Sequence, residues 1–162
     1  MENIFGRFVL SIFPDVVKNY FRSSFEAKTI AVALYGEISA ALEIALSKQN
    51  MEFLDTLEKR AEKNDFSPYY ISFKSEYFSA YSENAHQLGK LKPPNPELIS
   101  KFYISSKAIL DEHSAINTFI EEGRVGEEIT RGIKNLNELF RETARLGHRC
   151  CASLKHDYKI KS

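Results

Sequence analysis

The sequence lacks the features that define several common classes of protein. It has only two cysteines, Cys150 and Cys151, and they are adjacent in the chain. Adjacent cysteines cannot cross-link distant parts of a fold, so a disulfide framework is excluded. No apolar run reaches the ~18 residues of an ordinary membrane-spanning helix, so we expect none. The 22 basic residues balance 22 acidic residues, which argues against a globally basic nucleic-acid-binding protein.

The first residues also lack the organisation of a secretory signal. Such a signal needs a positive segment, then an apolar segment, then a cleavage site with small residues. Here the only early cation, Arg7, lies inside the apolar stretch, and no Ala-x-Ala site follows it. We therefore expect a cytoplasmic protein, with association at a membrane surface left open.

Motifs that carry chemistry are also missing. The segment 123–126 has two glycines but neither the spacing nor the lysine of a phosphate-binding loop. Asp111 and His113 are two apart, so they face different sides of a helix. His148 and Cys151 share a face, but close to a helix end that we expect to be exposed and frayed. We therefore predict no catalytic residue, no metal site and no cofactor, and binding rather than catalysis.

What the sequence does have is a strongly patterned beginning. Its apolar residues follow steps of three and one, which indicates one face of a helix. Pro14 predicts a kink near Phe13, or two short helices. We interpret residues 1–24 as an amphipathic arm with an interaction face formed by Phe5, Phe8, Val9, Ile12, Phe13, Val16, Val17, Tyr20 and Phe21.

The following segment, residues 25–48, predicts a long helix without proline. Between residues 29 and 46 only Glu37 and Glu43 are charged. A helix that is apolar nearly all round is typical of the centre of a bundle, so we expect this helix to be buried on all sides.

The rest of the chain predicts further helices joined by short connections. The expected elements are a helix over 50–63 capped by Asn50, an extended connector over 65–74, a helix over 75–88 ended by Gly89, a helix from the Asn95-Pro96 start to about 122, and a last helix from 126 or 127 past Cys151. We predict an all-α, up-and-down bundle of four main helices over residues 25–154, preceded by the arm and followed by a basic tail over 155–162.

Glu37 is the most notable single residue, because it lies in the middle of the least polar helix. A buried carboxylate without partners is costly, so we expect hydrogen-bond donors around it. Tyr81, Tyr103 and Tyr35 are candidate donors, and Arg141 or Arg145 is a candidate cation. A ligand-binding site at Glu37, Tyr81 and Tyr103 is one interpretation. The one we favour is a satisfied buried hydrogen bond that fixes the helix.

Three stretches taken together resemble a known group of proteins. They are Ala33-Leu34-Tyr35-Gly36-Glu37-Ile38, the run Tyr81-Ser82-Glu83-Asn84-Ala85-His86-Gln87-Leu88-Gly89-Lys90-Leu91, and Pro96-Glu97-Leu98-Ile99 leading to Phe102-Tyr103. Their order over residues 30–112 resembles small, uncharacterised bacterial all-helical proteins that often carry an N-terminal membrane helix. The resemblance implies an all-helical bacterial protein close to a membrane. Where the membrane helix would lie, this chain has the amphipathic arm.

These observations favour an interaction module that docks through the arm to a protein partner, to a second copy as a homo-oligomer, or to a membrane surface. Packing of the arm on its own bundle, or exchange between subunits, is favoured over membrane docking because the arm has a net charge of only +1. Residues 124–162 carry nine basic and five acidic side chains, which fits contact with anionic lipid or neutralisation of a helix dipole. Nucleic acid is a weaker candidate. The alternative function is a small-molecule-binding or hydrolytic bundle centred on Glu37 and the tyrosines.

Overall fold

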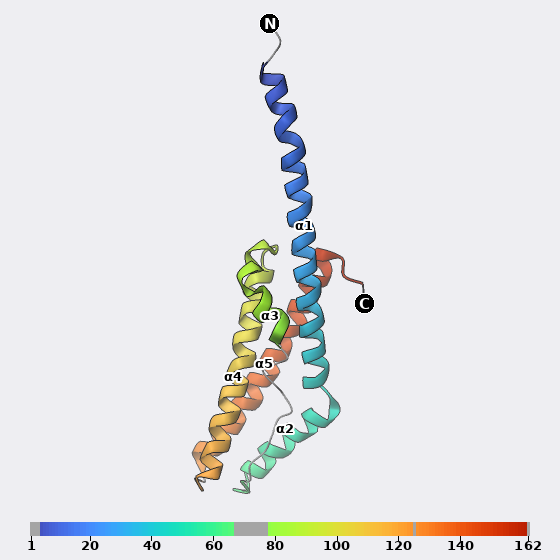
Figure 1. The fold of residues 1–162 in the computed structure, drawn as a ribbon. Helices are drawn as coiled ribbons and strands as arrows, with labels where there is room; N and C mark the ends of the chain where they lie inside the picture. The colour runs from blue at the N-terminus through green and yellow to red at the C-terminus, as the bar shows by residue number, and fades with distance from the viewer. Residues whose placement is uncertain (1–3, 67–77, 125, 162) are drawn as a thin grey trace.

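Every element in the described part of the chain is a helix (Figure 1). The computed structural model describes the backbone of residues 4–66, 78–124 and 126–161, and side chains from residue 22 onward in these ranges except 48 and 49. No strand occurs among them, which confirms the predicted all-α class. The helices are α1 (Ile4–Ala45), α2 (Lys48–Ala61), α3 (Ser79–Asn84), the short 3-10 helix η2 (Ala85–Lys90), α4 (Asn95–Glu121) and α5 (Glu127–Tyr158).

Helix α5 is the element on which the others assemble. α4 lies beside it over much of its length and makes the most extensive contact (Figure 1). α1 packs against the C-terminal half of α5, and α2 packs against its N-terminal half. α3 and η2 fill the space beside α1, and η2 also contacts α4. The body therefore has two buried clusters, one under α1 and one under α2.

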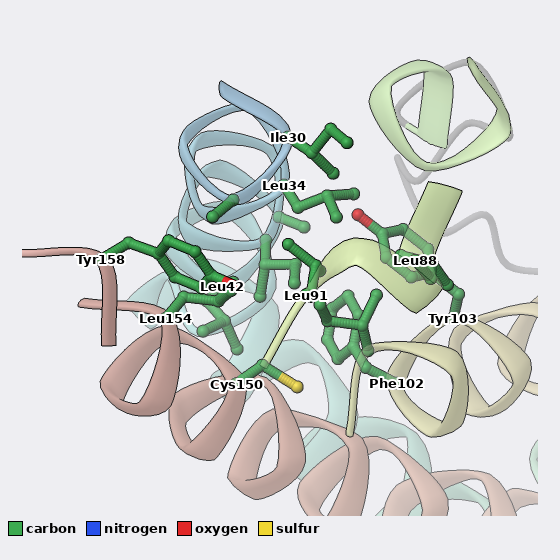
Figure 2. Close-up of a cluster of buried hydrophobic side chains, with 14 of the residues drawn as sticks. Ile30, Leu34, Leu42, Leu88, Leu91, Phe102, Tyr103, Cys150, Leu154 and Tyr158 are labelled. Carbon is green, nitrogen blue, oxygen red and sulfur yellow. The ribbon is translucent and has the colours of Figure 1, made fainter. Parts of the chain in front are cut away.

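The cluster under α1 is built from residues that are far apart in the sequence (Figure 2). Leu34 and Ile38 from α1 are completely buried, as are Ile99 of α4 and Leu154 of α5. Burying a side chain of this size contributes roughly 1.5–3 kcal/mol relative to leaving it exposed. Because this cluster packs against α1, it determines which side of α1 faces the body and therefore where Glu37 lies.

The course of α1 differs from the sequence prediction at Pro14. The alternative of two short helices is wrong, because α1 is one helix from Ile4 to Ala45. Its apolar steps keep the same register on both sides of the proline, so one continuous helix satisfies both halves. The first half of α1 extends beyond the body, and none of the other described helices lies alongside it (Figure 1).

The second half of α1 is not buried on all sides, which corrects another prediction. Its outward face carries Val32, Ala33, Gly36 and Ala40, which are exposed, and Phe25 retains 74% of its accessible surface. Alanine and glycine expose little apolar area. A sequence rich in them therefore predicts a central, buried helix even where one face of the helix is exposed to solvent. α1 covers one side of the body.

The helix ends also correct some predicted caps. Ser47, and not Asn50, caps α2, because its hydroxyl accepts a hydrogen bond from the Asn50 amide at 3.3 Å. Pro94 occupies the cap position of α4, which places Asn95 at the first helical position, where it is fully buried. Most of the predicted connector over 65–74 and the predicted start of the following helix at Ser75 lie outside the described residues.

The C-terminal end of α5 is ordered where fraying was predicted. The helix continues to Tyr158, and both Leu154 and Tyr158 are buried. The Tyr158 hydroxyl accepts a hydrogen bond from the Lys92 amide at 2.8 Å. Asp157 accepts a second one from Asn95 at 2.8 Å. These bonds hold the end of α5 against the loop that precedes α4.

Candidate functional site

The Glu37 carboxylate is the point where α1, α3 and α4 meet. Glu37 is half-buried between Leu34 and Ile38 on the inner side of α1. Its Oε2 accepts a hydrogen bond from the Ala80 amide at 2.6 Å. Its Oε1 accepts one from the Tyr81 amide at 3.1 Å and one from the Tyr103 hydroxyl at 2.5 Å. Glu37 is therefore hydrogen-bonded as predicted, although it is half-buried where full burial was expected.

The two backbone bonds make Glu37 a cap supplied by another helix. α3 has Phe78 at its cap position, and no side chain of its own accepts a hydrogen bond there. The first amides of a helix have no partner within it, and a carboxylate at that end also interacts favourably with the helix dipole. Glu37 thus takes the place of a local serine or aspartate and fixes α3 onto α1.

Tyr103 is held on all sides by aromatic rings and by the carboxylate. Its ring stacks on Tyr81 with centroids 4.0 Å apart and meets Phe78 edge-on at 5.3 Å. Burial, and then the hydrogen bond to Glu37, raise the pKa of Tyr103 well above its usual value, so the hydroxyl remains a donor.

The structure brings together the three candidate ligand-binding residues Glu37, Tyr81 and Tyr103, but not the candidate cations. Arg141 pairs with Asp55 of α2 at 3.1 Å, and Arg145 is exposed. Tyr35 is half-buried on α1 and makes no hydrogen bond to Glu37 among the described contacts. No cation therefore meets the carboxylate in the part of the chain that the structure describes.

A groove of about 540 Å³ lies beside the tyrosines. Tyr81 and Tyr103 contribute to its wall, together with Ile104, which is 67% exposed, and Lys107. Glu37 does not line it. The groove therefore does not expose the carboxylate, whose described hydrogen bonds are with Ala80, Tyr81 and Tyr103.

The cysteines and histidines do not assemble into a reactive site. No group of three His, Cys, Asp or Glu side chains within the described residues has the geometry to hold a metal ion. Cys150 is fully buried, which corrects its predicted place at an exposed helix end, and burial raises its pKa to about 12. Cys151 lies 3.5 Å from the Ser39 hydroxyl, and burial raises its pKa as well. A thiol with a raised pKa is a poor nucleophile at neutral pH.

Sequence reasoning missed a group of lysines at the place where α1 leaves the body. Lys28 of α1, Lys90 and Lys92 around the end of η2, and Lys159 at the end of α5 line one hollow of about 310 Å³. These residues come from three separate parts of the chain, so no local pattern indicates them. Only Lys159 belongs to the excess of cations that the sequence shows over residues 124–162.

The interaction face predicted for the arm lies outside the residues whose side chains are described. Its positions, 5–21, belong to the part of α1 for which the structure gives the backbone as helix. Within the described residues no single helix is long and apolar enough to cross a membrane. The segments Arg22–Ala45 and Asn50–Ala61 reach that threshold only as a pair, which is bent by 50°.

Comparison with known proteins gave no relative: no protein-family model, no curated protein and no solved structure matches the chain.

Proposed function

We propose that this protein is a non-enzymatic helical module that attaches to an anionic membrane surface through its N-terminal arm, residues 1–24. In this proposal α2, α4, α5 and the second half of α1 are the four main helices of the body. The observation that carries it is the course of α1, which leaves the body as one unbroken helix (Figure 1). A cluster of lysines lies at the point where it leaves.

The register of α1 supports a docking role for the arm. At about 100° per residue, the apolar positions of the arm fall on the same side of the helix as the residues that face the core. Positions 9, 13, 16 and 20 continue the line of Ala27, Leu34 and Ile38, which are buried in the body. The face that packs on the body therefore runs on past its end.

An apolar face of this size needs a cover. It has nine large side chains, five of them aromatic, and such a surface left in water leads to association. We expected the body itself to provide the cover. Because no described helix lies beside residues 4–21, the covers that we consider are a protein partner, a second copy of the chain and a membrane.

The charge at the base of the arm favours a membrane over a second copy. Lys28, Lys90, Lys92 and Lys159 surround this point. A basic residue close to an anionic bilayer contributes about 1 kcal/mol to binding. These lysines supply the positive charge that the arm alone lacks, and an amphipathic helix with basic neighbours is typical of attachment at the membrane interface.

Vesicle flotation of the full chain tests this proposal. We expect binding to phosphatidylcholine vesicles that contain phosphatidylserine, weaker binding to phosphatidylcholine alone, and loss of binding as salt is raised. Phe13→Asp should abolish binding. Phe25→Asp is the matched control, because Phe25 is exposed and lies about 120° around the same helix from position 13. A stable dimer that depends on Phe13 and ignores vesicles would contradict the proposal in favour of a second copy.

The alternative, a small-molecule or hydrolytic site at Glu37, has less support. A general acid or base must reach its substrate with a free oxygen or proton. The two oxygens of Glu37 accept three hydrogen bonds from the protein, two of them from backbone amides that cannot be released without loosening α3.

A further inference from the structure

The hollow at the base of the arm joins three parts of the chain. α1 contributes Ser23, Ser24 and Lys28, the region around the end of η2 contributes Lys90 and Lys92, and the end of α5 contributes Asp157 and Lys159. We call this hollow the basic basin. Its volume is about 310 Å³. This is larger than one small anion and leaves room for an anionic group that is attached to a larger molecule.

The basin keeps an excess of positive charge. Lys28 and Lys159 form no ion pair with any carboxylate among the described residues. Lys90 is engaged by Glu26 at 2.8 Å. Lys92 extends along the Tyr158 ring, 5.9 Å from its centroid, and its Nζ lies 3.5 Å from the Asp157 carbonyl oxygen.

The acidic side chain in the basin is already occupied. The Asp157 carboxylate accepts hydrogen bonds from Asn95 at 2.8 Å and from His156 at 3.1 Å. These bonds, His156 first, hold the pKa of Asp157 below its usual value. Asp157 is thus directed toward the α4 start and leaves Lys28 and Lys159 to an external anion.

The backbone that carries the lysines is fixed. The Lys92 amide is bonded to the buried Tyr158 hydroxyl at 2.8 Å, and the Lys159 amide is bonded to the Lys155 carbonyl at the end of α5. Asn95, which is fully buried, also donates to the Lys92 carbonyl at 3.0 Å. The positive charges are therefore presented by a preformed surface, which lowers the entropy lost on binding.

We propose that the basic basin binds a phosphate group, with the ammonium groups of Lys28 and Lys159 and the hydroxyls of Ser23 and Ser24 as its donors. Lysine binds phosphate as a point charge, and hydroxyls complete the shell of a tetrahedral oxyanion. In the form that rests on the proposed function, the phosphate belongs to a lipid headgroup beside the inserted arm. A free phosphate or phosphomonoester offers the same chemistry.

The experiment uses the full chain and two kinds of probe. The soluble probes are inorganic phosphate and glycerol 1-phosphate, with glycerol as the uncharged control, followed by amide NMR shifts. The membrane probes are phosphatidylcholine vesicles that carry phosphatidic acid or phosphatidylserine, matched in surface potential. We expect shifts at Ser24, Lys28 and Lys159 with the phosphates, and tighter binding to the phosphatidic acid vesicles.

A double variant with a matched control completes the test. Lys28→Ala/Lys159→Ala should weaken phosphate-dependent binding about 10-fold or more. Lys101→Ala/Lys107→Ala removes the same charge from the exposed side of α4 and should change binding little. Equal losses in both double variants would overturn the basin, because they indicate general charge attraction. A loss of stability without a loss of binding would also overturn it, since the lysines then only neutralise the α5 dipole.

The two proposals fail in different ways. If Phe13→Asp abolishes vesicle binding but the lysine variant matches its control, membrane attachment stands and the basin is wrong. If soluble phosphates shift the basin amides but no vesicle binds, the basin stands and the membrane proposal is wrong.

Discussion

At the scale of single residues, one carboxylate accepts hydrogen bonds from three separate donors. Glu37 satisfies the first amides of α3 and the hydroxyl of Tyr103 at once. Without it, two backbone amides and a buried phenol lose their acceptor. An unsatisfied donor is more costly than the gain from an average hydrogen bond, because its desolvation is not compensated.

Replacing Glu37 should therefore destabilise the fold measurably. We expect Glu37→Ala to lower the free energy of unfolding by about 1–3 kcal/mol in urea titrations. Glu43→Ala removes an exposed carboxylate from the same helix and should change it by less than about 0.5 kcal/mol. Equal melting curves for wild type and Glu37→Ala would show that solvent, and not α3, surrounds the carboxylate.

Cys150 should make stability depend on pH in the alkaline range. Its pKa is raised from 9.0 to about 12 by burial, so the folded state keeps a proton that the unfolded chain releases. This contribution is fully present below pH 9 and is lost as pH rises from 9 toward 12. Over this pH window the free energy of unfolding, measured by urea titration, should fall more steeply for wild type than for Cys150→Ala. Parallel slopes for the two proteins would contradict the buried thiol.

At the scale of elements, α1 has two faces that the sequence does not distinguish well. Both are largely apolar, but the outward one carries small residues around Gly36 beside the exposed Val32 and Ile44, while the inward one carries buried leucine and isoleucine. Helix positions followed from apolar periodicity for α2, α4 and α5, which were predicted close to their observed bounds, whereas α1 was predicted as an arm followed by a separate helix over 25–48. Which face is buried depends on neighbours that are distant in sequence, so it could not be read from α1 alone.

Two glycines in helices give opposite predictions. An added Cβ at Gly36 meets nothing within 4 Å, so Gly36→Ala should raise the free energy of unfolding by about 0.5–1 kcal/mol. At Gly147 of α5 an added Cβ would lie 2.8 Å from the Phe102 side chain of α4 and 2.9 Å from the Leu42 side chain of α1. Gly147→Ala should therefore lower the free energy of unfolding by about 1–3 kcal/mol.

Thermal melts of the two variants beside wild type separate these effects. Both substitutions improve helix propensity equally, so a difference in sign isolates the packing at Gly147. If both variants were stabilised, α5 would lie farther from α1 than the structure places it.

At the scale of the whole molecule, the sequence indicated only part of what the structure brings together. The sequence indicated Glu37, Tyr81 and Tyr103, because a lone carboxylate in an apolar helix demands donors. It did not indicate the basic basin, whose lysines meet only after α1, η2 and α5 have packed. A local sequence pattern indicates which partners a residue such as a buried carboxylate requires. A surface site depends instead on which distant segments the fold brings together.

Deleting residues 1–22 tests whether the arm belongs to the body or serves an external surface. If the arm packed on the body or were exchanged between subunits, as the sequence favours, the truncated protein would aggregate or change its oligomeric state. Among the described side chains of α1, the first buried one is Ala27, and the arm extends beyond the other described helices (Figure 1). We now expect the truncated protein to be soluble, monomeric by light scattering and as stable as the full chain, but unable to float with phosphatidylserine vesicles. A large drop in its melting temperature would mean that the arm covers the body, and the membrane proposal would fail.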